Sequence, residues 1–169
     1  QQLALEFSFS KMGRAPARFD ENELSALNAQ IVHSMSFDAV KPRLAKLVYG
    51  DKATPEFWDA VKGNLKGVPD AALWLAVVYG GGLTGPELDA DDQAFIDEAA
   101  KLFPAGDVTA TTWKEWVDAV KAKTGRKGKG LFMPLRRVLT DQEHGPEMDK
   151  MLLLIGGEKA RARLVQAAP

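Results

Sequence analysis

The sequence predicts an all-α protein made of short helices. Apolar residues recur at intervals of three and four along most of the chain, which is the spacing of one helix face. Ser, Thr or Asp precedes several of these segments, as helix N-caps do, and glycine or proline follows them. Residues 3–10 alternate with the period of a strand, but we do not expect a strand so close to a chain end.

In the first half of the chain, cap residues predict where four helices begin. Asp20 and Glu23 form a D-x-x-E start to an amphipathic helix, and Ser36 begins a second helix. Thr54 followed by Pro55 is an N-cap with a proline in the first helical position. The fourth helix, AALWLAVVY, is apolar on nearly all sides and ends at three glycines, so we expect it to be buried.

In the second half, five further helices are predicted. DQAFIDEAAKLF ends at Pro104, and Thr112 with Glu115 forms a second capping box (T-x-x-E) for a helix that ends at Gly125. LFMPLRRVL is predicted to be a helix with Pro134 inside its first turn. EMDKMLLLIG and EKARARLVQA complete the chain.

Composition bounds the class of protein. A chain of 169 residues with 46% hydrophobic and 27% charged residues is typical of one folded domain or two small ones. The absence of cysteine excludes disulfides, thiolate metal sites and a cysteine nucleophile, and it suits a cytoplasmic protein. The longest apolar runs fall short of the ~18 residues of a membrane span. A chain that opens with QQLALEF has neither an initiator methionine nor a signal peptide, so we expect it to be a piece of a longer protein.

The net charge of −1 hides a strong division between acidic and basic segments. Residues 67–100 carry seven acids and no base, whereas residues 119–140 carry seven bases and no acid. Because charges more than ~8 Å apart are largely screened at physiological ionic strength, each segment sets its own surface potential. The basic segment therefore fits either a solvated surface or a face that binds a polyanion.

No catalytic or metal-binding set of residues is recognisable. GRKGKG lacks the [ST] and the spacing of a phosphate-binding loop, and DADDQAFIDEAA lacks the glycine and the final glutamate of a calcium loop. The two histidines, His33 and His144, lie on different predicted elements and do not make a zinc site. Four tryptophans sit among aliphatic residues at helical spacing, which favours core packing over base stacking: Trp58, Trp74, Trp113 and Trp116.

The segment TGRKGKGLFMPLRR has the chemistry of an RNA-binding surface. Lysine and arginine side chains meet phosphates, and Arg126, Lys127 and Lys129 stand on a glycine-rich loop that leads into a helix N-terminus. Arg136 and Arg137 are planar donors suited to a base edge. We expect the following turn, TDQEHGPEM, to lie close to the same end of that helix.

Residues 124–164, TGRKGKGLFMPLRRVLTDQEHGPEMDKMLLLIGGEKARARL, resemble the C-terminal end of bacterial glutamyl-tRNA synthetases, which carries a TGRKGK-LF-PLR-ALTG-EHGPE pattern. FSKMGRAPARFDENELSALNAQIVH resembles the segment that follows the catalytic domain of these enzymes. The resemblance implies two small helical subdomains that bind the tRNA anticodon. We place them at residues 20–106 and 107–169, with residues 1–19 connecting to the catalytic domain.

The resemblance also implies roles for individual residues. The arginine of P-L-R contacts anticodon bases in the family, which gives Arg136 that role. The turn contributes Gly145 and Met148, with Pro146 fixing its conformation. Asp141 replaces the usual glycine of L-T-G, where an acid could weaken a phosphate contact or cap the turn.

The resemblance also implies which residue of this sequence occupies the family's position for reading the third anticodon base. The family places an arginine there when it discriminates at that base, and this chain has Asn64. This leaves open whether glutamine tRNA is accepted as well as glutamate tRNA.

The family's catalytic motifs, which bind ATP and Mg²⁺, are not in this sequence. The resemblance therefore implies a monomeric module that binds tRNA and its own catalytic domain, holds no cofactor and catalyses nothing by itself. A helical protein–protein adaptor and a small stand-alone enzyme are the alternatives.

Overall fold

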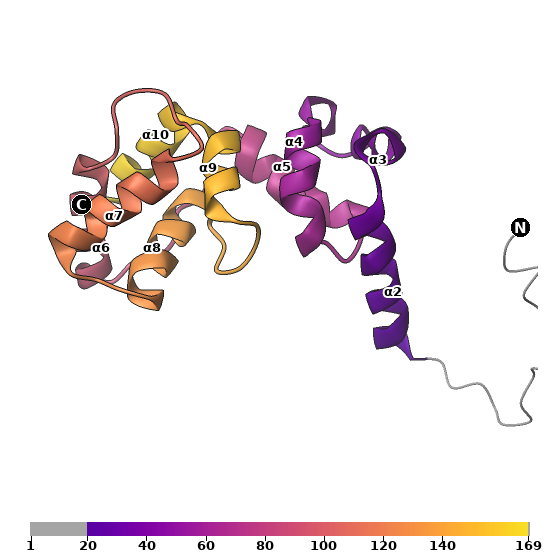
Figure 1. Cartoon of the computed structure of the whole chain (residues 1–169), viewed down its shortest axis with the longest axis horizontal. Coiled ribbons are helices and arrows are strands. Elements are labelled where there is room, and N and C mark those ends of the chain that lie inside the picture. The colour runs from indigo at the N-terminus through magenta and orange to yellow at the C-terminus, as the bar shows by residue number, and fades with distance from the viewer. Residues whose placement is uncertain (1–19, 169) are drawn as a thin grey trace, which may run out of the picture.

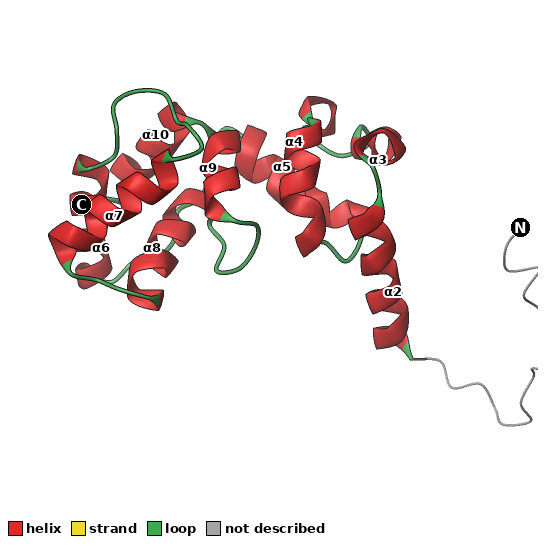
Figure 2. Ribbon diagram, viewed as in Figure 1, coloured by secondary structure: helices red, strands yellow, loops and turns green. Residues whose placement is uncertain are grey.

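The computed structural model describes residues 20–168, in which helices are joined by loops and no strand occurs (Figures 1 and 2). The α-helices are α2 (Glu21–Ser34), α3 (Phe37–Leu44), α4 (Pro55–Val61), α5 (Ala71–Tyr79), α6 (Ala90–Lys101), α7 (Thr112–Thr124), α8 (Lys129–Thr140), α9 (Met148–Ile155) and α10 (Gly157–Ala167). Short 3₁₀ turns are η2 (Gly50–Lys52), η3 (Lys62–Asn64) and η4 (Val68–Asp70). The all-α prediction is confirmed, and the segment at residues 3–10 lies outside the described residues.

Side-chain caps begin several of the helices, as predicted. Asp20, Ser36 and Thr54 each accept a hydrogen bond from a backbone N–H two or three residues later, at 2.8, 3.3 and 3.2 Å. Asp89 caps α6 in the same way, at 2.8 Å from the N–H of Asp92. Each bond satisfies a backbone donor that has no partner within its helix.

Two details of the second half differ from the prediction. Thr112 is the first residue of α7 and not its cap, because its hydroxyl accepts from the N–H of Thr109 at 2.8 Å and is used in the preceding turn. α8 begins at Lys129, two residues earlier than predicted, so Pro134 lies in its second turn. Gly125 ends α7 with a φ of 71°, as predicted for a glycine at a helix C-terminus.

The tryptophans form part of the core, as predicted. Trp58, Trp74 and Trp116 are buried, and Trp113 packs edge-on against Trp116 with ring centroids 5.6 Å apart. The indole N–H groups of Trp58 and Trp116 donate to the backbone oxygens of Met35 and Ala99 at 2.8 and 2.9 Å. Their polar atoms are therefore satisfied inside the core.

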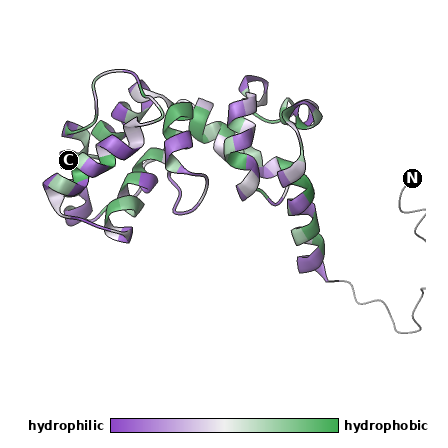
Figure 3. Ribbon diagram, in the orientation of Figure 1, coloured by the Kyte–Doolittle hydropathy of each residue, from purple (hydrophilic) through white to green (hydrophobic). Residues whose placement is uncertain are grey.

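The helices pack as two groups joined through α9. α6, α7, α8 and α10 contact one another on one side, and α9 contacts α4 and α5 on the other as well as α7 and α10 (Figure 1). Hydrophobic residues of α5 and α9 meet at the junction (Figure 3). The division after residue 106 stays a prediction, and the packing of α6 against α10, α8 and α7 favours a division earlier, between α5 and α6.

Helix α2, the first in the described part of the chain, keeps much of its apolar face exposed. Val32 of α2 is buried, but Leu24, Leu27 and Ile31 are 53%, 55% and 54% exposed. None of the helices in the described part of the chain is long and apolar enough to cross a membrane.

Candidate nucleic-acid interface

Arg136 lies where α8 meets the turn that follows it. Its Nη1 donates to the backbone oxygen of Pro146 at 3.0 Å, which ties the side chain to the turn. Burial lowers the pKa of the Arg136 guanidinium, although an arginine remains charged at neutral pH. The helix therefore holds a partly desolvated cation in a fixed position beside the turn.

The turn itself is shaped by the end of α8. Asp141 closes the helix in the left-handed conformation, with a φ of 57°, and its N–H donates to the oxygen of Arg137 at 2.7 Å. The hydroxyl of Thr140 donates to the oxygen of Arg136 at 2.8 Å and accepts from the N–H of Gln142 at 3.2 Å. These bonds fix the direction in which the turn leaves the helix.

Glycine is required in this turn because it lies against a buried tryptophan. A Cβ added to Gly145 would be 2.1 Å from Cη2 of Trp74, and the φ of 151° is unfavourable for other residues. Trp74 belongs to α5, in the other group of helices. The turn therefore packs against a helix from the first half of the chain.

A groove of about 390 Å³ lies where the turn meets the segment after η3. We call it the first groove; its lining includes Asn64, Lys66, Asp70, Leu73, Trp74, His144 and Gly145. Asn64 and Gly145 are distant in the sequence, and the fold brings them to one surface. Leu73 is 45% exposed and gives the groove an apolar wall beside its polar groups.

The basic loop lies at the opposite end of α8 from this turn. Lys129 begins the helix and Thr140 ends it, so about 17 Å separates them at 1.5 Å per residue. The expectation that the loop and the turn share one end of the helix was therefore wrong. Lys127 and Lys129 are exposed, and within residues 20–168 neither side chain forms a hydrogen bond or an ion pair.

Arg126 is held within the protein by several contacts. Its guanidinium forms an ion pair with Asp92, donates to the oxygen of Asp91 at 2.8 Å, and lies over the ring of Phe95 at 4.3 Å. It also donates to the oxygen of Gly130 at 3.2 Å. These contacts favour a structural role for Arg126 over the predicted phosphate contact.

Three other predicted site residues are partly or wholly buried. Met148 and Pro146 are buried, so the side chain of Met148 belongs to the core of α9. Arg137 donates to the oxygen of Glu87 at 3.2 Å and is half-buried. Of the predicted residues, Asn64 and Gly145 line the first groove together, and Arg136 is tied to the same turn through Pro146, the residue after Gly145.

The sequence did not single out Lys66 or His144 as binding residues. Both line the first groove and both are exposed. Neither residue has a sequence pattern that marks it as a binding residue. Lys66 is a single lysine in the segment NLKG, and His144 stands in the EHGPE segment, which was recognised only through the family resemblance.

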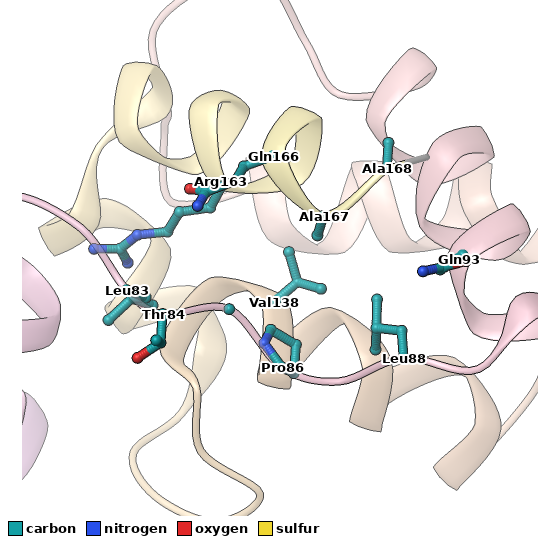
Figure 4. Close-up of a pocket in the computed structure, with 11 residues that line it drawn as sticks. Leu83, Thr84, Pro86, Leu88, Gln93, Val138, Arg163, Gln166, Ala167 and Ala168 are labelled. Carbon is teal, nitrogen blue, oxygen red and sulfur yellow. The ribbon is translucent and has the colours of Figure 1, made fainter.

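A separate cavity of about 200 Å³ lies between the segment before α6, Val138 of α8 and the end of α10 (Figure 4). Arg163 is the one charged residue of its lining, and its guanidinium donates to the oxygens of Leu139 and Val77 at 2.6 and 2.5 Å. The cavity contains none of the predicted site residues. No group of three His, Asp or Glu side chains that could hold a metal ion occurs in the described part of the chain.

The chain is similar to known proteins over most of its length. Residues 85–168 match the family described as anticodon binding domain. The chain is 52% identical over 164 residues to glutamate–tRNA ligase 2 of Hyphomonas neptunium, which covers 97% of this chain and 36% of that protein. It is 44% identical over 162 residues to glutamate–tRNA ligase 1 of Brucella ovis, covering 95% of this chain and 35% of that protein.

The fold is also shared with a solved structure. A glutamate tRNA ligase from Elizabethkingia meningosepticum, in complex with its amino acid, superposes with a TM-score of 0.75 at 22% identity, covering 96% of this chain and 35% of that one. The fold and the matched residues define an all-helical anticodon-binding domain. Residues 85–168 belong to the anticodon-binding-domain family, and nearly the whole chain is similar to part of the glutamate–tRNA ligases. The chain spans about a third of the length of the curated relatives that it matches.

Proposed function

We propose that this chain reads the anticodon of glutamate tRNA for a ligase that charges tRNA with glutamate. The observation that carries the proposal is that Asn64 and Gly145 line one groove, while Arg136 is bonded to Pro146 in the same turn. A groove with an apolar wall, amide and cationic groups suits an unpaired base, which needs a stacking surface and partners for its edge.

The proposal divides the work between two regions. Arg136 and the first groove contact bases, while Lys127 and Lys129, before and at the start of α8, contact phosphates; Lys129 lies about 10 Å from Arg136 along the helix. Phosphate contacts supply affinity that depends on salt, and base contacts supply discrimination. With Asn64 in the place of an arginine, acceptance of glutamine tRNA is a second outcome to be measured.

The partners and chemistry of the whole enzyme are part of the proposal. ATP and Mg²⁺ would bind in a catalytic domain that this sequence does not include, and the described residues offer no metal-binding group of their own. We propose a monomer that works in the cytoplasm, with its catalytic domain and tRNA as partners.

Two variants test the division of roles. Arg136→Ala is expected to weaken binding of a stem-loop with the glutamate anticodon by about 5- to 150-fold, because one good base contact is worth ~1–3 kcal/mol. A stem-loop with a scrambled anticodon should lose much less. The double variant Lys127→Ala/Lys129→Ala should weaken both RNAs equally and reduce the log–log salt slope by about 1.4.

The results that would contradict the proposal are equally specific. Equal loss of both RNAs on Arg136→Ala would mean that this residue supplies only charge. Binding that does not depend on salt, or no binding of the stem-loop, would favour the protein–protein adaptor.

A further inference from the structure

A second groove lies next to the first, on the other side of the short segment at residues 65–67. Its volume is about 420 Å³, and its lining includes Asn28, Val32, Arg43, Lys46, Val68 and Pro69. The first groove is lined by Lys66 and the second by Gly67, so one short stretch of backbone separates them. We call that stretch, residues 65–67, the ridge.

The ridge is held in place by side chains from two elements. Asp70 accepts hydrogen bonds from the N–H groups of Lys66 and Gly67 at 3.0 and 2.9 Å. From α2, His33 Nε2 bonds the oxygen of Leu65 at 2.9 Å, and the amide of Asn28 donates to the oxygen of Lys66. Because its polar groups are satisfied by side chains, the ridge presents both grooves in one fixed geometry.

The charged residues that line the second groove are positive. Arg43 and Lys46 line it, and Lys66 stands on the ridge beside it. All three side chains are exposed, and none of them takes part in an ion pair within residues 20–168. No acidic residue lines the second groove. Cations without acidic partners around a concave surface attract a polyanion.

The floor of the second groove is apolar. Val32 and Val68 are buried beneath it, and Pro69 is exposed at its side. Proteins that hold single-stranded RNA combine this kind of apolar platform with cations that follow the backbone. The groove thus has a place for a base or ribose and a place for the adjoining phosphate.

We propose that the second groove binds the ribonucleotide next to the one in the first groove, with its phosphate on Arg43 and Lys46. The RNA strand then crosses the ridge, where Lys66 faces the linkage between the two nucleotides. This inference rests on the proposed function, because it extends the same RNA strand beyond the first groove. It extends the RNA-binding surface from the first groove to the face formed by α2, by α3 and the residues after it, and by η4.

The variant Arg43→Ala/Lys46→Ala tests the proposal on the anticodon stem-loop. Loss of two contacts to single-stranded phosphate should reduce the log–log salt slope by about 1.4. The affinity of the variant, relative to that of the unmodified chain, should therefore be about 25-fold lower at 0.1 M salt than it is at 1 M salt. The matched control is Lys52→Ala/Lys114→Ala, which removes the same charge from exposed lysines that line neither groove. We expect the control to bind with the slope of the unmodified chain.

A second measurement locates the contact without depending on one variant. Loop linkages of the stem-loop are replaced one at a time by uncharged methylphosphonates. The unmodified chain should lose affinity at the linkage on the far side of the nucleotide in the second groove, and Arg43→Ala/Lys46→Ala should be insensitive there while it stays sensitive at the linkage that Lys66 faces. The same pattern of sensitive linkages in both proteins would overturn the proposal.

The two levels of the account fail in different ways. If the unmodified chain does not bind the stem-loop with salt dependence, the proposed function fails. If the chain binds and Arg136→Ala weakens it, but Arg43→Ala/Lys46→Ala keeps the original affinity and salt slope, this inference alone fails. The single variants Arg43→Ala and Lys46→Ala, each with a slope change of about 0.7, replace the double variant if it does not fold.

Discussion

Asp141 has two effects: it ends helix α8, and it adds a negative charge beside the turn that follows. Its left-handed conformation, with a φ of 57°, closes α8 and starts the turn that carries Gly145. Glycine adopts this conformation without strain, which explains why the family's L-T-G pattern has a glycine there. An aspartate tolerates it better than most residues do, so the substitution is a cap with an added negative charge.

We therefore expect Asp141→Gly to stabilise the chain and to strengthen RNA binding. Relief of the left-handed conformation should raise the free energy of unfolding by up to ~1 kcal/mol, offset in part by the greater freedom of glycine in the unfolded chain. Removal of a negative charge should raise the affinity for the stem-loop at low salt and have no effect at high salt. Urea unfolding and a salt titration measure the two effects. Weaker RNA binding by the variant would mean that Asp141 contacts the RNA directly.

The contact of Gly145 with Trp74 could not be predicted from the residues. The resemblance placed Gly145 at the anticodon, and the tryptophan was correctly predicted to be a core residue. The sequence contains no sign that the two meet, because they belong to elements distant in the chain. The structure shows that the packing of the turn against Trp74 requires glycine at this position.

At the scale of the helices, local chemistry predicted most of the boundaries. Asp20, Ser36 and Thr54 cap helices because a short polar side chain reaches the free N–H groups of the first turn. The predicted cap at Thr112 was wrong because its hydroxyl bonds backward to Thr109. Threonine can bond in either direction, and the spacing T-x-x-E does not distinguish the two.

Arg126 connects three features of neighbouring elements. Pro134 has no N–H to donate to the oxygen of Gly130 in α8, and Arg126 donates to that oxygen instead. The same guanidinium holds Asp91 and Asp92 at the start of α6. An arginine that looked like a phosphate ligand in the sequence thus replaces a missing helix bond and joins α6 to α8.

Arg126→Ala should consequently destabilise the fold while leaving the salt dependence of RNA binding nearly unchanged. Loss of its charge-assisted hydrogen bonds and of the contact with Phe95 is expected to lower the free energy of unfolding by ~2 kcal/mol. The matched variant Lys127→Ala, at an exposed neighbour, should change stability by less than ~0.5 kcal/mol and reduce the salt slope by about 0.7. Denaturant melts and salt titrations separate the two residues. If Arg126→Ala instead kept the stability of the chain and reduced the salt slope, Arg126 would be a phosphate ligand.

At the scale of the whole molecule, the division of charge has partly an internal explanation. The acidic segment and the basic segment pack together, since Arg126 pairs with Asp92 and Arg137 donates to the oxygen of Glu87. These contacts use part of the positive charge inside the protein. Lys127 and Lys129 keep theirs at the surface.

The grooves could not be predicted because each is assembled from separate elements. Helix periodicity gives the face that an element buries, but it does not say which loop meets which turn. Asn64 and Gly145 meet because α9 packs on α4 and α5 and so brings the turn before it to the first half of the chain. The resemblance pointed to Asn64 and Gly145 separately, and tertiary packing brings them to one groove.

The central claim is that the turn after α8 and the segment around Asn64 form one anticodon-binding surface. An amide chemical-shift map, recorded while the chain is titrated with a stem-loop carrying the glutamate anticodon, tests it most directly. The account predicts saturable shifts at Asn64, Lys66, Arg136, His144 and Gly145 together. Shifts confined to the acidic helix α6 and its neighbouring loops would contradict it.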